Sequence, residues 1–401
     1  MRLLINKSNL DDLASAVSVE YGDLLMGIYL LIFVLLMLFV FFEKKKETIP
    51  NTPSFKSIFS CKKDLSELVI LLLSITIIVI SGIRWQVGSD WESFLHDFEY
   101  FKTATWNEIQ YSVYGITYGN GYVFITYFFA KYIGNYSIYL TFQAFFIVSC
   151  VYPIIYKYSK YPLISFLGLF AFSFGYAFAV PRSGFAIAIC FRAFDALLCN
   201  KRMRFVLLVG LATLFHNTAI IFLLLFFLDK VKLSNLGVIV IGIISLLISF
   251  FTKTILYKIA SLSFIPLSYS LRIIQYVSEN VDYVSVSGFV RVLTRGFVLV
   301  LLFIFLWNKR KDRFNNIIVN MYVFASAIYI AVSNTSEVLM RLSYYFEDIS
   351  QFFIFAECID SCKGRNNRLV IKLIIVLFFI GKMLPRLVGQ SFIVPYRTIL
   401  Y

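Results

Sequence analysis

The chain has 401 residues, of which 60% are hydrophobic and only 15% are charged. A soluble domain of this length cannot bury so much apolar surface, so the composition excludes a soluble globular protein and favours lipid as the solvent. In a soluble protein the net charge of +14 would suggest nucleic acid as a partner. In a membrane protein, basic residues instead set the orientation, because they gather in short cytoplasmic loops. We therefore expect no nucleic-acid partner.

Apolar residues form ten stretches that can cross the bilayer core, for which a helix needs roughly 17 to 25 residues. The stretches lie near 24–42, 66–83, 137–156, 162–179, 184–199, 236–251, 292–307, 317–334, 342–358 and 369–385. Two further stretches, 121–133 and 205–228, are ambiguous. We predict an all-α polytopic membrane protein, a single transmembrane domain over residues 1–401 with about 10–12 transmembrane helices.

Six clusters of basic residues resolve the two ambiguous stretches. The clusters lie at 44–63, 157–160, 201–204, 230–232, 309–313 and 363–372. All six can face the cytoplasm only if 121–133 does not cross the membrane and 205–228 enters and leaves on the same side. We therefore predict a re-entrant hairpin at 205–228, broken near His216-Asn217, and a short amphipathic or re-entrant helix at 121–133 on the outer side. Such a break must be buried in protein or line a wet cavity.

This topology places both termini outside and leaves two sizeable outer, periplasmic loops, at about 84–136 and 252–291. The first apolar stretch ends in Glu43-Lys44-Lys45-Lys46 without a small-residue cleavage site, so we expect no cleavable signal peptide. The six cysteines have no CxxC spacing, and no DxD, P-loop or GxSxG motif occurs. We therefore expect no disulfide framework, no metal site and no nucleotide site.

Arginines on the predicted outer side are the most informative residues. They are Arg84, Arg182, Arg272, Arg291, Arg295 and Arg341, all at or near predicted helix ends. The positive-inside rule disfavours this placement, so it needs a reason. Several guanidinium groups in one cavity could hold a pyrophosphate and stabilise its charge as a leaving group. The alternative is that each is an anchor at the membrane interface, which we favour less for Arg182 and Arg341 because polar residues flank them.

Three other residues are candidates for proton transfer or substrate contact. His216 lies roughly 16 Å of helix from the basic residues at 201–204, near mid-membrane at the predicted hairpin break. It could be a base, or a hydrogen-bonding group without a chemical role. Asp90, which follows the second apolar stretch, could accept a proton from a sugar hydroxyl. Glu337 could act in the same way, and either acid could instead be a solvated loop residue.

Arg192 and Asp195 are charged residues inside the apolar stretch 184–199. Residues three apart share one face of a helix and can pair. Charges within a membrane are costly unless they are paired or hydrated. We therefore interpret the two residues as a structural ion pair.

Five short motifs occur in an order that resembles one family of membrane proteins. They are Arg84 to Asp90, Gly119 to Phe124, Pro181 to Ile189, Leu211 to Ala219 and Met340 to Phe346. In these segments the chain resembles the EpsG family, within the broader Wzy-type O-antigen polymerases. Ser183 and Asn120 depart from the glutamine and the acid that are common in the family.

The resemblance implies a GT-C-like helical bundle in the bacterial inner (cytoplasmic) membrane. Such proteins polymerise undecaprenyl-pyrophosphate-linked oligosaccharide repeat units on the periplasmic face, as a step of lipopolysaccharide or related polysaccharide biosynthesis. The implied activity is that of a metal-independent glycosyltransferase without a cofactor. The implied partners are the lipid-linked donor and acceptor, membrane lipids, and a protein that regulates chain length.

The resemblance and the outer arginines together predict roles for individual residues. We expect Arg182 and Arg341 to bind the pyrophosphate of the donor. The further candidate substrate contacts are Arg84, Arg291, Arg295 and Glu337. We expect His216 or Asp90 to deprotonate or orient the acceptor hydroxyl.

Two alternatives stay open from the sequence. A flippase or transporter of the same lipid-linked unit would also need a cationic cavity, although it would more usually show two similar halves, and we find none. An O-antigen ligase or acyltransferase with a catalytic histidine would also suit His216.

Overall fold

Long apolar runs determine the architecture, and the regular elements that the structure describes are helices. The computed structural model describes residues 31–46, 65–85, 91–112, 118–262, 267–278, 286–335 and 337–388. The elements are a helix over Leu31–Phe42, α2 (Leu65–Ile83), α3 (Trp91–Thr103), α4 (Trp106–Tyr111), α6 (Asn120–Phe128), the π-helix η2 (Phe129–Ile133), α7 (Tyr136–Tyr158), α8 (Pro162–Ala179), α9 (Pro181–Leu198), α10 (Arg202–Phe215), the 3₁₀-helix η3 (Asn217–Leu224), α11 (Leu225–Leu228), α12 (Asn235–Ala260), α13 (Leu267–Ser278), α14 (Val286–Leu301), η4 (Leu302–Leu306), η5 (Trp307–Lys309), α15 (Arg313–Val332), α16 (Glu337–Met340), η6 (Arg341–Ser343), α17 (Tyr344–Ser361) and α18 (Arg365–Val388).

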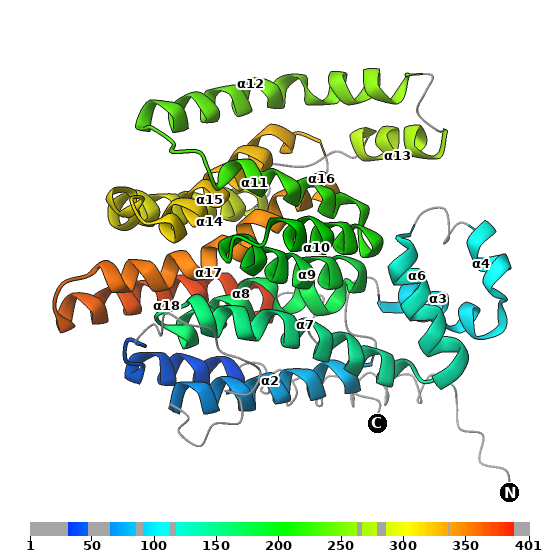
Figure 1. Cartoon of the computed structure of the whole chain (residues 1–401), viewed down its shortest axis with the longest axis horizontal. Helices are drawn as coiled ribbons and strands as arrows, with labels where there is room; N and C mark the ends of the chain where they lie inside the picture. Colours follow the sequence, from blue (N-terminus) through cyan, green and yellow to red (C-terminus); the bar gives the residue numbers. More distant parts are fainter. Residues whose placement is uncertain are drawn as a thin grey trace, which may run out of the picture.

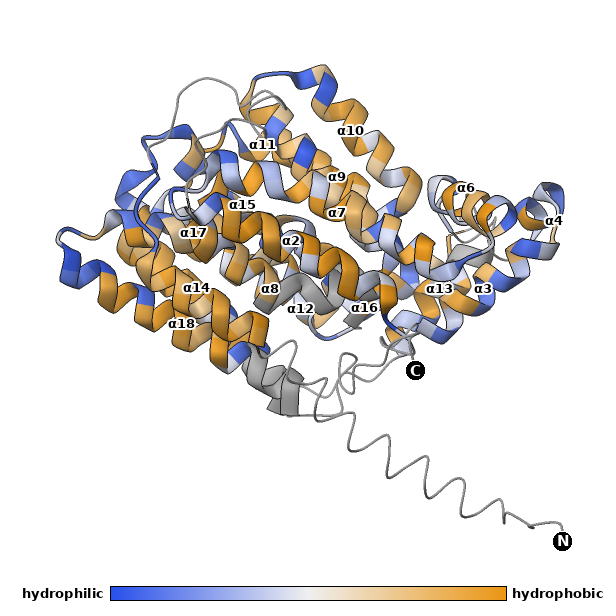
Figure 2. Cartoon of the chain, turned by 90° about the horizontal axis from the view of Figure 1, so that it is seen from below, coloured by the Kyte–Doolittle hydropathy of each residue, from blue (hydrophilic) through white to orange (hydrophobic). Residues whose placement is uncertain are grey.

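The long helices lie side by side and roughly parallel, while α3, α4 and α6 form a separate lobe at one end (Figure 1). Five of the described helices are long and apolar enough to cross a membrane. They are Ser66–Ile83, Tyr136–Tyr158, Asn235–Ala260, Arg291–Lys309 and Arg313–Val332. Figure 2 shows hydrophobic residues along most of the length of the long helices and hydrophilic residues at their ends and on α3 and α4. The prediction of an all-α polytopic membrane protein is confirmed.

Each of the ten predicted apolar stretches coincides with a described helix, the first of them from Leu31 onward. Polar caps begin several of these helices. The side chains of Asn135, Ser234 and Asp312 accept hydrogen bonds from backbone amides in the first turns of α7, α12 and α15. Such caps satisfy amide groups that have no partner inside the helix. The predicted outer loop at 252–291 begins later than expected, because α12 continues to Ala260, and this loop contains α13.

Basic residues from distant parts of the chain meet at one end of the helices. The ammonium groups of Lys45 and Lys160 lie 2.5 and 2.9 Å from the carboxylate of Asp360. Lys372 donates a hydrogen bond of 2.7 Å to the backbone carbonyl of Glu43. Because basic segments remain in the cytoplasm, we expect this end to face the cytoplasm and the lobe to face outward, and we call the two ends the cytoplasmic end and the outer end.

The predicted hairpin is present, and its turn is at His216. The backbone there is extended, with φ −148° and ψ 112°, between α10 and η3. The rings of Phe205 and Phe222 lie 6.2 Å apart, and the Arg202 guanidinium lies 5.5 Å from the ring of Phe226. The two arms therefore run antiparallel and return to the same side. This confirms the break that the charge pattern predicted.

Arg313 fixes the base of the hairpin at the cytoplasmic end. Its guanidinium donates hydrogen bonds of 2.8 Å to the side chains of Asn200, before the hairpin, and Asp229, after it. With 14 residues, α10 rises about 21 Å, which is less than the bilayer core of about 30 Å. An arm of this length is too short to cross the bilayer core, as the prediction of a re-entrant hairpin requires. One face of α10 is exposed at Leu207, Leu211 and Leu214.

The predicted Arg192–Asp195 pair needs correction. The Asp195 carboxylate lies 2.6 Å from the ammonium group of Lys157 and accepts a hydrogen bond of 2.8 Å from Tyr158. Both partners belong to α7, whereas Arg192 acts on Asp195 only through its charge. Spacing within one helix could not show that α7 packs beside α9.

The outer lobe, which comprises α3, α4, α6 and η2, docks on the tip of the hairpin through two glycines. A Cβ atom added at Gly119 would lie 2.2 Å from the carbonyl oxygen of Leu214. One added at Gly121 would lie 3.0 Å from the Leu214 Cβ. Only residues without a side chain permit this approach, since a backbone carbonyl cannot move aside as the end of a long side chain can.

We predict that replacing Gly119 with alanine forces the lobe and the hairpin tip apart. Overpacking of this kind typically costs about 1–3 kcal/mol, so the melting temperature of the detergent-solubilised protein should fall. The control is Gly210→Ala on α10, because nothing lies within 4 Å of a Cβ atom added there. Alanine favours a helix over glycine by about 1 kcal/mol, so this variant should melt no lower than the parent. Equal melting temperatures would contradict the close approach.

Candidate cationic site at the outer end

Three of the predicted site residues come together from three separate elements. Arg182 is the second residue of α9, His216 forms the hairpin turn, and Arg341 begins η6. The positive charges of Arg182 and Arg341 both act on the His216 imidazole. All three side chains are half-buried. The cluster is therefore packed into the protein and still reachable from outside it.

The lengths of the helices place this cluster away from the cytoplasmic end. With 18 residues, α9 rises about 27 Å between Leu198, which is close to Asn200 at the cytoplasmic end, and Pro181, which precedes Arg182. Pro181 occupies the first turn of α9, a position that suits proline because its missing N–H would have no partner there. A helix N-terminus presents free amide groups and a partial positive charge, which add to the attraction of the arginines for an anion.

A short hydrogen-bond chain holds the imidazole of His216. Its Nδ1 lies 2.5 Å from the Oγ1 of Thr218, and that oxygen lies 3.1 Å from the hydroxyl of Tyr345. Tyr345 is buried in α17. Each hydroxyl in this chain can donate or accept, so the His216 ring can carry its proton on Nδ1 or on Nε2. With Nδ1 engaged, Nε2 is the nitrogen that can meet a substrate.

The outer lobe positions Arg182. The centre of its guanidinium lies 4.1 Å from the centre of the Tyr118 ring. The Tyr118 hydroxyl donates a hydrogen bond of 3.0 Å to the carboxylate of Asp97, which is only 3% exposed. Stacking on an aromatic ring attracts a cation and also fixes the plane of the guanidinium. Asp97 therefore orients the ring on which Arg182 rests.

Sequence reasoning missed Asp97 and Tyr118. One signal was present, because Asp97 shares the apolar face of α3 with Phe94, Phe98 and Phe101, all of them buried. An acid at an apolar position of an amphipathic helix indicates a buried partner. Tyr118 carried no such signal, since it lies in a loop before α6.

Arg84 directly follows α2 and lies near α7. It is buried at the end of α2, and its charge acts on Tyr136 and Tyr139 of α7. The neighbouring Tyr122 interacts electrostatically with both Arg182 and Asp97, and burial raises the pKa of this phenol well above its usual value. Tyr122 thus stays neutral. Arg84 is therefore buried where α2 ends beside α7, and the charges that act on His216 are those of Arg182 and Arg341.

Arg295 and Glu347 form a buried ion pair. The two side chains meet at 2.7 Å, and the Arg295 guanidinium lies 3.5 Å from the centre of the Tyr329 ring. Arg291 lies one turn earlier on α14. The hydroxyl of Ser343, which lies in η6 with Arg341, donates a hydrogen bond of 3.4 Å to the Glu347 carboxylate, so the pair lies near the site. Glu347 was not among the predicted residues, although it is an acid within an apolar stretch.

Two predicted site residues receive no side-chain description. Asp90 lies outside the described residues, and only the backbone of Glu337, at the start of α16, is described. Among the described residues, no group of three His, Cys, Asp or Glu side chains could hold a metal ion.

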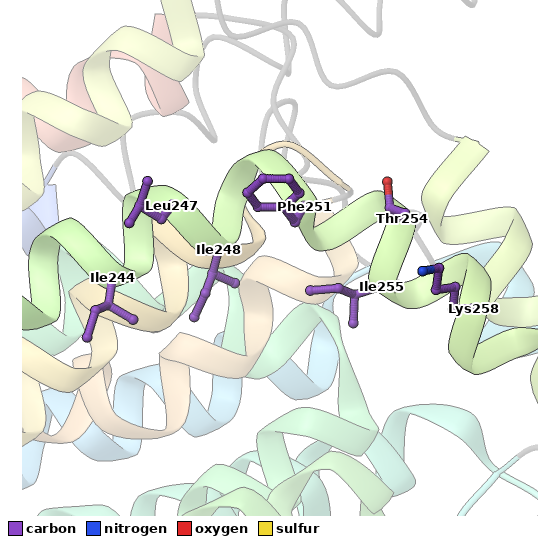
Figure 3. Close-up of a pocket in the computed structure, with 7 residues that line it drawn as sticks. All are labelled: Ile244, Leu247, Ile248, Phe251, Thr254, Ile255 and Lys258. Carbon is purple, nitrogen blue, oxygen red and sulfur yellow. The ribbon is translucent and has the colours of Figure 1, made fainter.

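A hollow of about 410 Å³ lies against one face of α12, away from the residues above. Figure 3 shows the residues that line it, which are Ile244, Leu247, Ile248, Phe251, Thr254, Ile255 and Lys258. It contains none of the predicted site residues, and its lining is mostly apolar. We therefore assign the candidate site to the His216 cluster.

The fold and this cluster define a polytopic membrane protein with a cationic site at its outer end. Residues 67–398 match the EpsG family, and the chain belongs to that family. The family resemblance predicted from short motifs is thereby confirmed, and the chain is a membrane protein of polysaccharide biosynthesis. No curated protein and no solved structure matches the chain. The predicted likeness to GT-C enzymes therefore stays a prediction.

We predict that Glu347→Leu strongly destabilises the protein, since it leaves the charge of Arg295 buried and unpaired. Removing one partner of a buried pair typically costs about 3–5 kcal/mol. Replacing both residues, as Glu347→Leu with Arg295→Met, should recover most of the loss. Thermal unfolding of the three proteins in detergent measures the effect. A single variant as stable as the parent would show that the pair is not structural.

Proposed function

We propose that this protein polymerises undecaprenyl-pyrophosphate-linked oligosaccharide repeat units into O-antigen or a related surface polysaccharide. The reaction is a metal-independent glycosyl transfer on the periplasmic face of the bacterial inner membrane. Membership of the EpsG family supports the substrate class. The observation that carries the proposal is that Arg182, near the start of α9, and Arg341, at the start of η6, both lie near His216 at the turn between α10 and η3.

The two arginines suit the leaving group of this reaction. A diphosphate presents oxygens that planar guanidinium groups bind in pairs, and its negative charge grows as the glycosidic bond breaks. Arg182 is held in a fixed plane by Tyr118. Because its orientation is set before the substrate binds, little reorganisation is needed during the reaction. The N-terminus of α9 adds to the attraction.

His216 is our first candidate for the base, and Asp90 remains the second. The acceptor hydroxyl oxygen bonds to the anomeric carbon of the donor sugar as the bond from that carbon to the diphosphate oxygen breaks. The hydroxyl proton passes to the Nε2 of His216, and the electron pair of the broken bond stays on the polyprenyl diphosphate. For this step Nδ1 must carry the ring proton and donate it to Thr218, which is 2.5 Å away.

We predict that Arg182→Ala and Arg341→Ala each abolish long glycan chains. Loss of one electrostatic donor typically lowers the rate about a hundredfold or more. The assay mixes purified protein with a lipid-linked repeat unit and separates the products by length on a gel. Lysine at either position should restore only part of the activity, because an ammonium group cannot bind two oxygens in one plane.

The control for these variants is Arg204→Ala, since Arg204 is an exposed arginine near the cytoplasmic end of α10. This variant should make chains of normal length. Normal chains from both Arg182→Ala and Arg341→Ala would remove these residues from the site.

The same assay separates the proposal from a flippase. In detergent there is no membrane to cross, so only a polymerase lengthens the glycan. A protein that moves the unit between leaflets of proteoliposomes and never lengthens it would be a transporter. One that transfers single units only onto a lipid A core would be a ligase.

A further inference from the structure

The outer lobe carries a stripe of exposed aromatic residues on its α6–η2 segment. Phe124, Phe128 and Tyr132 are 59%, 45% and 73% exposed. They follow one another four residues apart, so they share a face of the helix. The rings of Phe128 and Tyr132 lie 5.4 Å apart, which shows that they adjoin. We call these three residues the aromatic stripe.

The opposite face of the segment is the one that packs against the protein. Tyr122 and Thr126 are fully buried there, and the hydroxyl of Thr126 lies 3.1 Å from that of Tyr139 on α7. The segment thus has two apolar faces, one packed against the protein at Val123, Phe129 and Ala130 and the other, the aromatic stripe, exposed. Exposed aromatic residues in a row are unfavourable in water, so a partner must cover them.

The position of the stripe identifies the partner. After η2 the chain turns at Gly134, with φ 71°, and a helix that can span the membrane begins at Tyr136. The stripe therefore ends within a few residues of the level at which α7 enters the bilayer. Ile138 and Phe145 of α7 are exposed and continue the apolar surface into the membrane. The stripe is therefore followed directly in the chain by the exposed apolar residues of a membrane-spanning helix.

We propose that α6–η2 lies in the plane of the outer membrane surface, with the aromatic stripe between the headgroups and upper acyl chains of the outer leaflet. Tyrosine and phenylalanine suit this region because their rings are apolar and the tyrosine hydroxyl can remain hydrated. Helices with one apolar face commonly lie in this way. Of the two predictions for 121–133, an amphipathic helix or a re-entrant helix, this proposal favours the amphipathic helix at the membrane surface.

The docking of α6–η2 on the membrane also sets the depth of the cationic site relative to the membrane surface. Tyr118, which stacks on Arg182, lies just before α6, and Gly119 touches the hairpin tip beside His216. Fixing α6 at the membrane surface therefore fixes the depth of Arg182 relative to that surface. This consequence rests on the proposed function, whereas the docking of the stripe does not.

Tryptophan fluorescence in nanodiscs tests the docking. Phe128→Trp adds a reporter to the stripe, and Glu99→Trp adds one to an exposed position of α3. The signal of each reporter is the fluorescence of the variant minus that of the parent protein, which contains four tryptophans. Phosphatidylcholine brominated near the headgroup should quench the reporter at 128, and aqueous iodide should not. The reporter at 99 should show the reverse. Quenching of both reporters by iodide, with no effect of brominated lipid on either, would overturn the proposal.

A second experiment tests the height of the site. The triple variant Phe124→Ser, Phe128→Ser and Tyr132→Ser leaves the buried face of α6 intact. In membranes it should raise the KM for the lipid-linked donor several-fold with kcat little changed, and in detergent the difference should disappear. An equal loss in both media would indicate a folding defect and contradict the anchor. If the parent protein makes no polymer while the reporter at 128 is quenched by lipid, the proposed reaction fails and the docking stands.

Discussion

The architecture depends on a helix that stops partway through the membrane. The backbone groups at such a stop need partners, because lipid offers none. The amide of His216 donates to the carbonyl of Ala212 at 3.0 Å, and its carbonyl accepts from the amide of Ala219 at 2.9 Å. Arg313 joins the two ends of the hairpin by hydrogen bonds to Asn200 and Asp229, and Gly119 and Gly121 of the outer lobe pack against Leu214 near its turn. The turn is stable because both ends are held, and this stability allows a polar ring to lie at that depth.

The arginines at the outer end of the protein differ in the partners that surround them. Arg295 is neutralised by Glu347 at 2.7 Å, so it contributes mainly to packing between α14 and α17. Arg84 is buried at the end of α2. Arg182 is held by an aromatic ring, which orients a guanidinium without cancelling its charge. The difference between a carboxylate partner and a ring partner therefore decides which arginine can attract an anion.

Much of the fold could be predicted because membranes make simple demands on sequence. Length and apolarity identified the spans, and the position of basic residues identified the hairpin, since charge cannot easily cross lipid. The part played by Asp97, Tyr118 and Glu347 could not be predicted in this way. Each depends on contacts between elements far apart in the chain, which neither periodicity nor charge counting reports. The pairing of Asp195 with Lys157 was missed for the same reason.

The exposed face of α10 leaves His216 only one helix away from the surrounding lipid. A long hydrocarbon chain can then remain among its neighbours in the bilayer while its polar end reaches the hairpin tip. For a substrate of this kind, encounter takes place in two dimensions. The frequency of encounter then depends on the number of lipid-linked substrate molecules per unit area of membrane. Adding inert phospholipid would lower this frequency even if the substrate concentration in the whole sample stayed constant.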